Sequence, residues 1–250
     1  MIILGIHAGH SASATLMRDG VVCGMIQEER LTGRKNQTGF PKRAIERLVA
    51  IHLDGDFEKI DRIGYGSLFD SIPWTGLNHY SDYGPLDFVR QMHEYWYPKF
   101  YGTADLQEEV TWTDEYWYDK IRNGEELNED HNFDLSFLNS MTGQEAFDHF
   151  NQVERREAVK RHFDWRGKVD FIEHHTCHSH WALWGNCLSP EQTKDALILT
   201  GDSRGDDSNW TVSVLNDNGD IERIAGGLDN VVARIYKYAT LVLGMKPNEH

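Results

Sequence analysis

Four histidines are gathered within residues 174–180 of the chain, in the stretch His-His-Thr-Cys-His-Ser-His. His174 and His178 are four residues apart, so they lie on one face if this stretch is helical. Two imidazoles at that spacing can ligate one metal ion, as they do in many zinc and iron sites. For a single histidine a structural role is the commoner explanation, and we interpret His175 and His180 as capping, hydrogen-bonding or surface residues. The candidate metal ligands are therefore His174 and His178.

A third ligand must come from another part of the chain, and Asp202 is the candidate. It ends an apolar strand expected over 196–202, and open sheets deliver functional groups to a cleft at the ends of their strands. Ser203 and Gly205 follow it, and small residues there let backbone N–H groups approach a phosphate. The alternative is an ordinary turn, which uses the same residue types.

The loop over residues 7–15 has a similar character, because a strand end is followed by small residues and a histidine. Small side chains at Ser11 and Ser13 let the backbone and hydroxyls close around an anionic group, and His10 could touch that group directly. The alternative is a tight β-turn. Two such loops facing each other across a cleft would form a two-sided phosphate clamp, which is how actin-like ATPases hold nucleotides.

The elements that must position these loops are expected in the same order twice. Strands over 2–8, 11–18 and 21–29, with Asp19-Gly20 as a hairpin turn, precede a helix over 41–53. Strands over 196–202, 209–219 and 220–227, with a turn at Gly219, precede a helix over 230–244. On this last helix Val231, Ile235, Tyr238 and Leu241 or Val242 should face inward. Repetition at this scale indicates duplicated domains.

We therefore predict a first subdomain over 1–194 and the start of a second over 195–250. A strand over 60–66, a helix over 144–163 and a strand over 169–173 complete the first copy. Residues 67–140 break the pattern with aromatic residues, Gly, Pro and Asp, and we interpret them as an insertion that serves as a lid or a dimer surface. Its aromatic residues should form a small core of its own, with a wall that stacks on a ligand as the alternative. The second copy stops after one helix, so we expect the front portion of a longer protein.

Composition narrows the class of protein. The net charge of −15 argues against general binding to the phosphate backbone of nucleic acids. Three cysteines without metal-site spacing suit a reducing compartment, and the chain shows neither a signal peptide nor an apolar run long enough for a membrane. We expect a cytoplasmic protein. The acidic stretch over 101–150 predicts a solvated surface, with a wall facing a cationic substrate as the alternative.

Four ordered motifs resemble those of the O-carbamoyltransferase family, which includes nodulation-factor, antibiotic and aminoglycoside carbamoyltransferases. The matching residues are Gly5-Ile6, His10 to Ala14, Glu28-Glu29-Arg30, Lys35 and Gly39-Phe40-Pro41 in the first motif; His174, His175, His178 and Ala182 in the second; Asp202 to Asp206 in the third; and Leu243 to Glu249 in the fourth. Ser11 and Ser203 depart from the family pattern, which has Asp and Gly there, so the details of phosphate contact are in question.

The resemblance implies an actin-like (sugar kinase/Hsp70/actin) ATPase fold of the Kae1-like kind, with its second subdomain truncated. A C-terminal YrdC-like domain, absent from this sequence, would make carbamoyl-adenylate from ATP and carbamoyl phosphate. The Kae1-like domain would then pass the carbamoyl group to a hydroxyl of a small-molecule or sugar-like acceptor. The family tends to pair, so a homodimer is possible.

The resemblance also implies roles for individual residues. His174, His178 and Asp202 would hold a divalent metal, Fe²⁺ first and Mn²⁺ or Zn²⁺ as alternatives. His10, Lys35 and Arg30 would be the catalytic residues beside the carbamoyl group and the phosphates. Residues binding the nucleotide or its phosphates would be His10, Ser11, Ser13, Ser203 and Gly205.

Two other functions are compatible with the same fold. A relative of threonylcarbamoyl-adenosine synthases acting on tRNA would share the fold and the metal pair, although the net charge speaks against it. A nucleotide-binding regulatory or assembly protein would keep the fold without the chemistry. The acceptor of a carbamoyltransferase cannot be read from these motifs, and amino sugar, nucleoside, lipid-linked sugar and polyketide hydroxyls all stay open.

Overall fold

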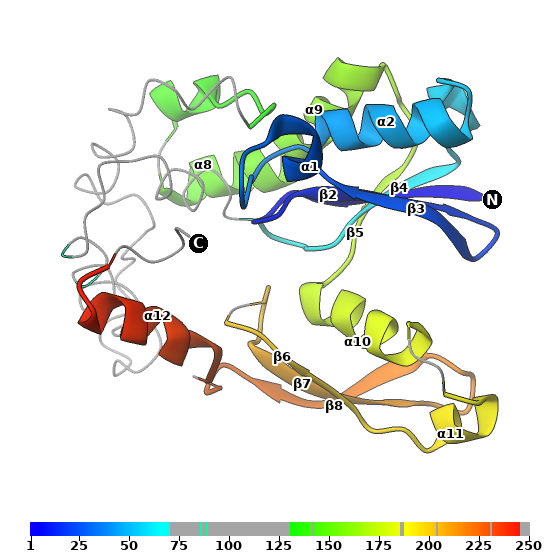
Figure 1. Ribbon diagram of the computed structural model, residues 1–250, viewed down its shortest axis with the longest axis vertical. Helices are drawn as coiled ribbons and strands as arrows, with labels where there is room; N and C mark the ends of the chain where they lie inside the picture. Colours follow the sequence, from blue (N-terminus) through cyan, green and yellow to red (C-terminus); the bar gives the residue numbers. More distant parts are fainter. Residues whose placement is uncertain are drawn as a thin grey trace.

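The structure is a computed structural model that describes residues 1–70, 131–141, 143–185, 188–203, 205–230 and 232–245, together with residues 86 and 89. Most of the predicted insertion therefore lies outside the described residues. Two β-sheets with helices against them give a mixed α/β architecture (Figure 1). Within the described part of the chain, no helix combines the length and the apolar character needed to cross a membrane.

The first sheet has five strands in the order β3-β2-β1-β4-β5. These strands are β1 (Ile2–His7), β2 (Ser13–Arg18), β3 (Val21–Gln27), β4 (Arg62–Tyr65) and β5 (Val169–Phe171). The pairs β1–β2 and β2–β3 are antiparallel, whereas the pairs β1–β4 and β4–β5 are parallel. The carboxyl ends of the parallel strands therefore meet at one edge, the edge at which open α/β sheets place their sites.

Helices cover one face of this sheet, as Figure 1 shows. They are α1 (Glu29–Thr32), α2 (Lys42–His52), α8 (Gly143–His149) and α9 (Arg155–Phe163), with a π-helical turn (Phe150–Glu154) between the last two. The helix predicted over 41–53 is confirmed as α2, and its apolar stripe of Ala44, Ile45, Leu48 and Val49 is buried. The Glu28 carboxylate accepts hydrogen bonds from the backbone N–H groups of Arg43 and Ala44, so the first residue of the Glu-Glu-Arg motif caps α2.

The far end of the predicted insertion belongs to the main core. Phe133, Leu135, Phe137 and Leu138 are buried in the same cluster as the strands and α2. The backbone of His131 approaches so closely that a Cβ at Gly39 would lie 2.6 Å from its carbonyl oxygen. Residues 131–141 thus pack with the first subdomain, and a separate small core could apply only to residues outside the described part.

The second sheet has three antiparallel strands in the order β6-β7-β8. They are β6 (Ile198–Gly201), β7 (Trp210–Leu215) and β8 (Ile221–Gly227). α10 (His174–Trp184) lies between the two sheets, and α11 (Pro190–Lys194) leads into the second one (Figure 1). The described α10 thus joins the two halves of the chain.

The same order of three strands recurs in the two halves of the chain. Each copy is a pair of antiparallel hairpins whose second turn has a glycine with positive φ, +82° at Gly20 and +83° at Gly219. Each copy also has a register shift in its middle strand, after Leu16 in the first and after Val212 in the second. The turns need glycine because side chains disfavour this region of φ.

The inward face predicted for the last helix is wrong for the residues that the structure describes. On α12 (Val232–Val242), Ile235 is 59% exposed and Val242 is 86% exposed. α12 lies beside the end of the three-stranded sheet and not across it as α2 does on the first sheet (Figure 1). The apolar residues of α12 thus have helical spacing, but no described part of the chain covers them.

Candidate metal centre

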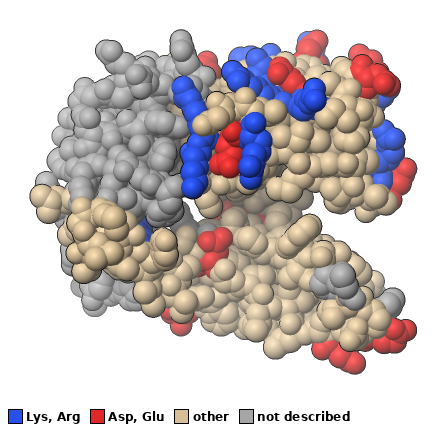
Figure 2. All heavy atoms as spheres, in the orientation of Figure 1, with Lys and Arg blue, Asp and Glu red and all other residues tan. Residues whose placement is uncertain are grey.

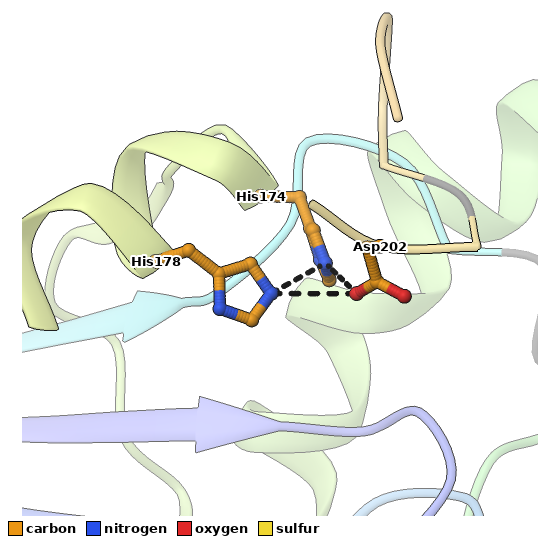
Figure 3. A group of neighbouring side chains, drawn as sticks. All are labelled: His174, His178 and Asp202. Atoms are coloured by element: carbon orange, nitrogen blue, oxygen red, sulfur yellow. Dashed lines mark hydrogen bonds and ion pairs between the residues drawn. The ribbon is translucent and has the colours of Figure 1, made fainter. Parts of the chain in front are cut away.

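The structure brings the three predicted ligands together, as Figure 3 shows. His174 and His178 lie on one face at the start of α10, and Asp202 follows β6. His174 Nε2 lies 3.0 Å from Asp202 Oδ2 and 3.0 Å from His178 Nε2. His178 Nε2 lies 3.4 Å from the same carboxylate oxygen. Three ligand atoms from two halves of the chain thus point at a common centre.

These separations fit a divalent cation. Nitrogen and oxygen ligands lie about 2.1 Å from zinc or iron, so two ligands at a right angle are about 3.0 Å apart and two at a tetrahedral angle about 3.4 Å. A proton on His174 Nε2 can lie along only one of its two short contacts. A cation among the three atoms would satisfy all of their lone pairs, and two histidines with one carboxylate form the ligand set of non-haem iron sites.

Electrostatics at the centre also favour a positive charge. Burial alone would raise the pKa of Asp202, but hydrogen bonds from the rings of His174 and His178 outweigh burial, so the pKa lies below its ordinary value. Burial alone would lower the pKa of His174, but Asp202 outweighs it and raises that pKa. Asp202 is therefore an anion that attracts either protons on the rings or a metal ion.

His175 has the structural role expected of it. It is fully buried, with Nδ1 2.7 Å from Thr200 Oγ1 and Nε2 3.0 Å from the Ser208 carbonyl. Burial lowers its pKa, so the neutral ring anchors α10 to the second sheet. His180 is exposed on the same helix. The cluster thus divides into two candidate ligands, one anchor and one surface residue.

The loop after β6 is shaped differently from the phosphate loop that the sequence predicts. The Gly205 N–H donates to the Ser208 carbonyl, and the Ser203 N–H donates to the Asp202 carboxylate. Both amides are thus engaged within the loop and are not presented to a phosphate. A Cβ at Gly205 would lie 2.5 Å from His175 Cδ2, so glycine is needed here for the close approach of His175.

Two acidic residues that position the centre were not predicted from the sequence. Glu173 caps α10, since its carboxylate accepts from the N–H groups of His175 and Thr176, and it also pairs with Arg223. Asp206 accepts from the N–H of His174. Glutamate is a weak N-cap signal, and the third motif includes Asp206 without assigning it a role, so neither contact was predicted.

The end of β1 lies beside the centre. His7 interacts electrostatically with His174 and His178, and its Nε2 lies 3.2 Å from the carbonyl oxygen of His10. Burial, with a smaller contribution from the neighbouring histidines, lowers the pKa of His7 to about 4. A neutral imidazole is therefore held at the carboxyl end of β1, next to the loop that carries His10.

The other predicted site residues surround this loop without joining the triad. Ser11 has a φ of +60°, and Ser13 is buried opposite His7 at the start of β2. Arg30 and Lys35 are exposed, and in the part of the chain that the structure describes no hydrogen bond or ion pair joins them to the triad. Figure 2 shows basic side chains gathered over α1 and the turn after it, at the margin of the hollow between the two sheets.

The lowered pKa of His7 predicts a pH dependence of stability. The folded state binds fewer protons at this ring than the unfolded state between about pH 6.5 and 4, so stability is lost as the pH falls through this window. With EDTA present, the free energy of unfolding should fall by about 2 kcal/mol from this residue between pH 7.5 and 5. Urea denaturation of the wild type and of His7→Gln at pH 7.5 and 5 measures the difference.

The control for that experiment is His180→Gln, which changes an exposed ring on α10. It should keep the wild-type fall in stability, whereas His7→Gln should lose stability less steeply. An equally steep fall in all three proteins would show that His7 is not held neutral by the fold.

Comparison with known proteins gives one limited similarity. No protein-family model matches the chain. A stretch of 48 residues is 40% identical to the uncharacterized protein MJ1051 of Methanocaldococcus jannaschii, and it covers 19% of this chain and 9% of that protein. The similarity thus spans less than a tenth of the relative's length, and the relative's name states no activity.

Proposed function

We propose that this chain is the Kae1-like portion of an ATP-dependent O-carbamoyltransferase with an actin-like fold. The observation that carries the proposal is the convergence of His174, His178 and Asp202, which come from the junction of the two repeated units. The resemblance in motif order supports the same assignment. The repeated strand unit agrees with the duplicated subdomains of an actin-like fold.

The reaction is the transfer of a carbamoyl group from carbamoyl-adenylate to an acceptor hydroxyl. The bond between the carbamoyl carbon and the phosphate oxygen breaks, AMP leaves with the electron pair, and the acceptor oxygen bonds to the carbon and loses its proton. Negative charge therefore grows on the carbonyl and on the departing phosphate. A divalent cation held by the triad would supply Lewis-acid stabilisation of that charge.

The chain's own residues supply the remaining functions. Arg30 and Lys35 are both exposed, and their charges are suited to bind the phosphate of the adenylate and to stabilise AMP as it leaves. His10, exposed after β1, would contact the same group. One well-placed electrostatic donor lowers such a barrier by about 3 kcal/mol. Because the ring of His7 is neutral, it would place no positive charge beside the metal.

The proposal is tested on a protein that carries this chain together with the YrdC-like domain. Transfer of labelled carbamoyl from carbamoyl phosphate to a panel of hydroxyl compounds should need both ATP and metal, and AMP should be formed in step. AMP formation that needs threonine and bicarbonate in place of carbamoyl phosphate would identify the tRNA-modifying class instead. Nucleotide binding without turnover under any of these conditions would indicate a regulatory protein.

A further inference from the structure

The loop over residues 67–70 is held by two buried side chains from the helical layer. It follows β4 and is the described start of the predicted insertion. Arg155 donates to the carbonyls of Ser67 and Leu68, both at 2.9 Å, and to the Ser67 hydroxyl at 3.0 Å. Asn151 accepts from the N–H of Asp70 and donates to its carbonyl. These bonds fix the loop from the side of the first subdomain.

Asp206 holds the same loop from the second half of the chain. Its Oδ2 accepts from the N–H of Leu68 at 2.8 Å, and its Oδ1 accepts from the N–H of Phe69 at 3.1 Å. Oδ2 also accepts from the N–H of His174 at 2.8 Å. One carboxylate therefore joins the loop after β4 to the first residue of α10, which is also a candidate metal ligand.

Asp206 and Asp202 act on His174 from the same loop. Asp202 contacts the ring of His174, whereas Asp206 contacts its backbone. Glu173 accepts from the next two N–H groups of α10, so each of the three carboxylates contacts a different group at the start of the helix. Removing Asp206 would therefore leave α10 capped while releasing the His174 backbone and the loop over 67–70 together.

We propose that Asp206 is a positioning residue that couples the loop at the base of the predicted insertion to the metal-binding end of α10. A carboxylate that accepts three N–H bonds is a strong hydrogen-bonding group. Loss of one such charge-assisted bond raises the equilibrium constant for local opening of the backbone about tenfold or more. Movement of the loop over 67–70 then shifts the position of the His174 backbone, and a metal ion that fixes His174 makes the loop more ordered. The metal-dependent half of this inference rests on the proposed function.

Amide hydrogen exchange in Asp206→Ala and Asp206→Asn tests the coupling without metal. Exchange at Leu68, Phe69 and His174 should rise together by about tenfold, while the midpoint of urea unfolding shows that the fold is kept. The matched control is Asp207→Asn, which removes a charge from the next residue, one that pairs with Arg223 and not with the loop. A rise confined to one of the two segments, or an equal rise in the control, overturns the proposal.

Metal titration adds a readout that a purely structural role would not change. Zn²⁺ should slow exchange at Leu68 and Phe69 in the wild type but not in Asp206→Ala, and the variant should bind Zn²⁺ about 10- to 100-fold more weakly, as supporting partners of metal ligands do when removed. Unchanged affinity together with unchanged protection of the loop contradicts the coupling. If the wild type binds none of Zn²⁺, Mn²⁺ or Fe²⁺, the proposed function fails, and the exchange measured without metal still decides the coupling.

Discussion

His174→Ala should abolish binding of a divalent metal at the proposed site of His174, His178 and Asp202. His174 Nε2 makes the shortest contacts of the centre, 3.0 Å to both of its partners, so its removal opens one corner of the triad. Loss of a supporting partner of a ligand already weakens a site 10- to 100-fold, and loss of a ligand itself should exceed about 100-fold. Metal analysis of purified protein and competition with a chromophoric chelator measure the change.

The control variant is His180→Ala on the same helix. It removes an exposed imidazole of identical chemistry that lies outside the triad. It should keep wild-type metal content, whereas His178→Ala should match His174→Ala. Equal metal content in His174→Ala and in the wild type would mean that the converging atoms do not form the binding site, and the carbamoyltransferase proposal would lose the observation that carries it.

The elements that position this centre could be predicted because their signals are local. Alternating apolar residues and a glycine turn define each hairpin unit, and the two positive-φ glycines at Gly20 and Gly219 have the same cause. The candidate metal ligands His174 and His178 follow from their helical spacing, and Asp202 follows from its position after an apolar strand. None of these inferences needs knowledge of contacts between distant parts of the chain.

The contacts that could not be predicted are all long-range. Gly205 resembles a phosphate-loop glycine, but it is needed because His175 packs against it. Asp206 resembles a solvated acid, but it accepts N–H groups from two distant segments. The apolar stripe of α12 has helical spacing, yet the exposed Ile235 shows that spacing does not tell where a partner surface lies. Tertiary packing decides each of these cases.

Arg155 is the clearest example, and its removal should have the largest effect on stability. It is fully buried, its guanidinium lies 4.6 Å from the ring centre of Tyr65 and 4.4 Å from that of Phe171, and burial lowers its pKa. No acidic side chain pairs with it among the hydrogen bonds of the described residues. Neutral oxygens and aromatic faces stabilise its charge, and the negative charges of Asp70 and Asp206 favour it from nearby.

Arg155→Met should lower the free energy of unfolding by about 3 kcal/mol. Methionine relieves the cost of burying a charge, but it orphans the carbonyls of Ser67 and Leu68 and removes both aromatic contacts, and these losses outweigh the relief. Arg155→Lys should be at least as destabilising, because an ammonium keeps the buried charge without the planar set of donors. Urea denaturation at pH 7.5 gives the ranking.

The neighbouring Arg156 provides the matched control. Its guanidinium also lies 4.4 Å from the ring centre of Phe171, but the residue is exposed, and Arg156→Met should cost less than about 1 kcal/mol. If Arg155→Lys restored wild-type stability, charge alone would explain the residue. If Arg155→Lys stays destabilised, the fold requires the geometry of the guanidinium donors that bind the loop over 67–70. The buried arginine and Asp206 would then hold that loop from opposite halves of the chain.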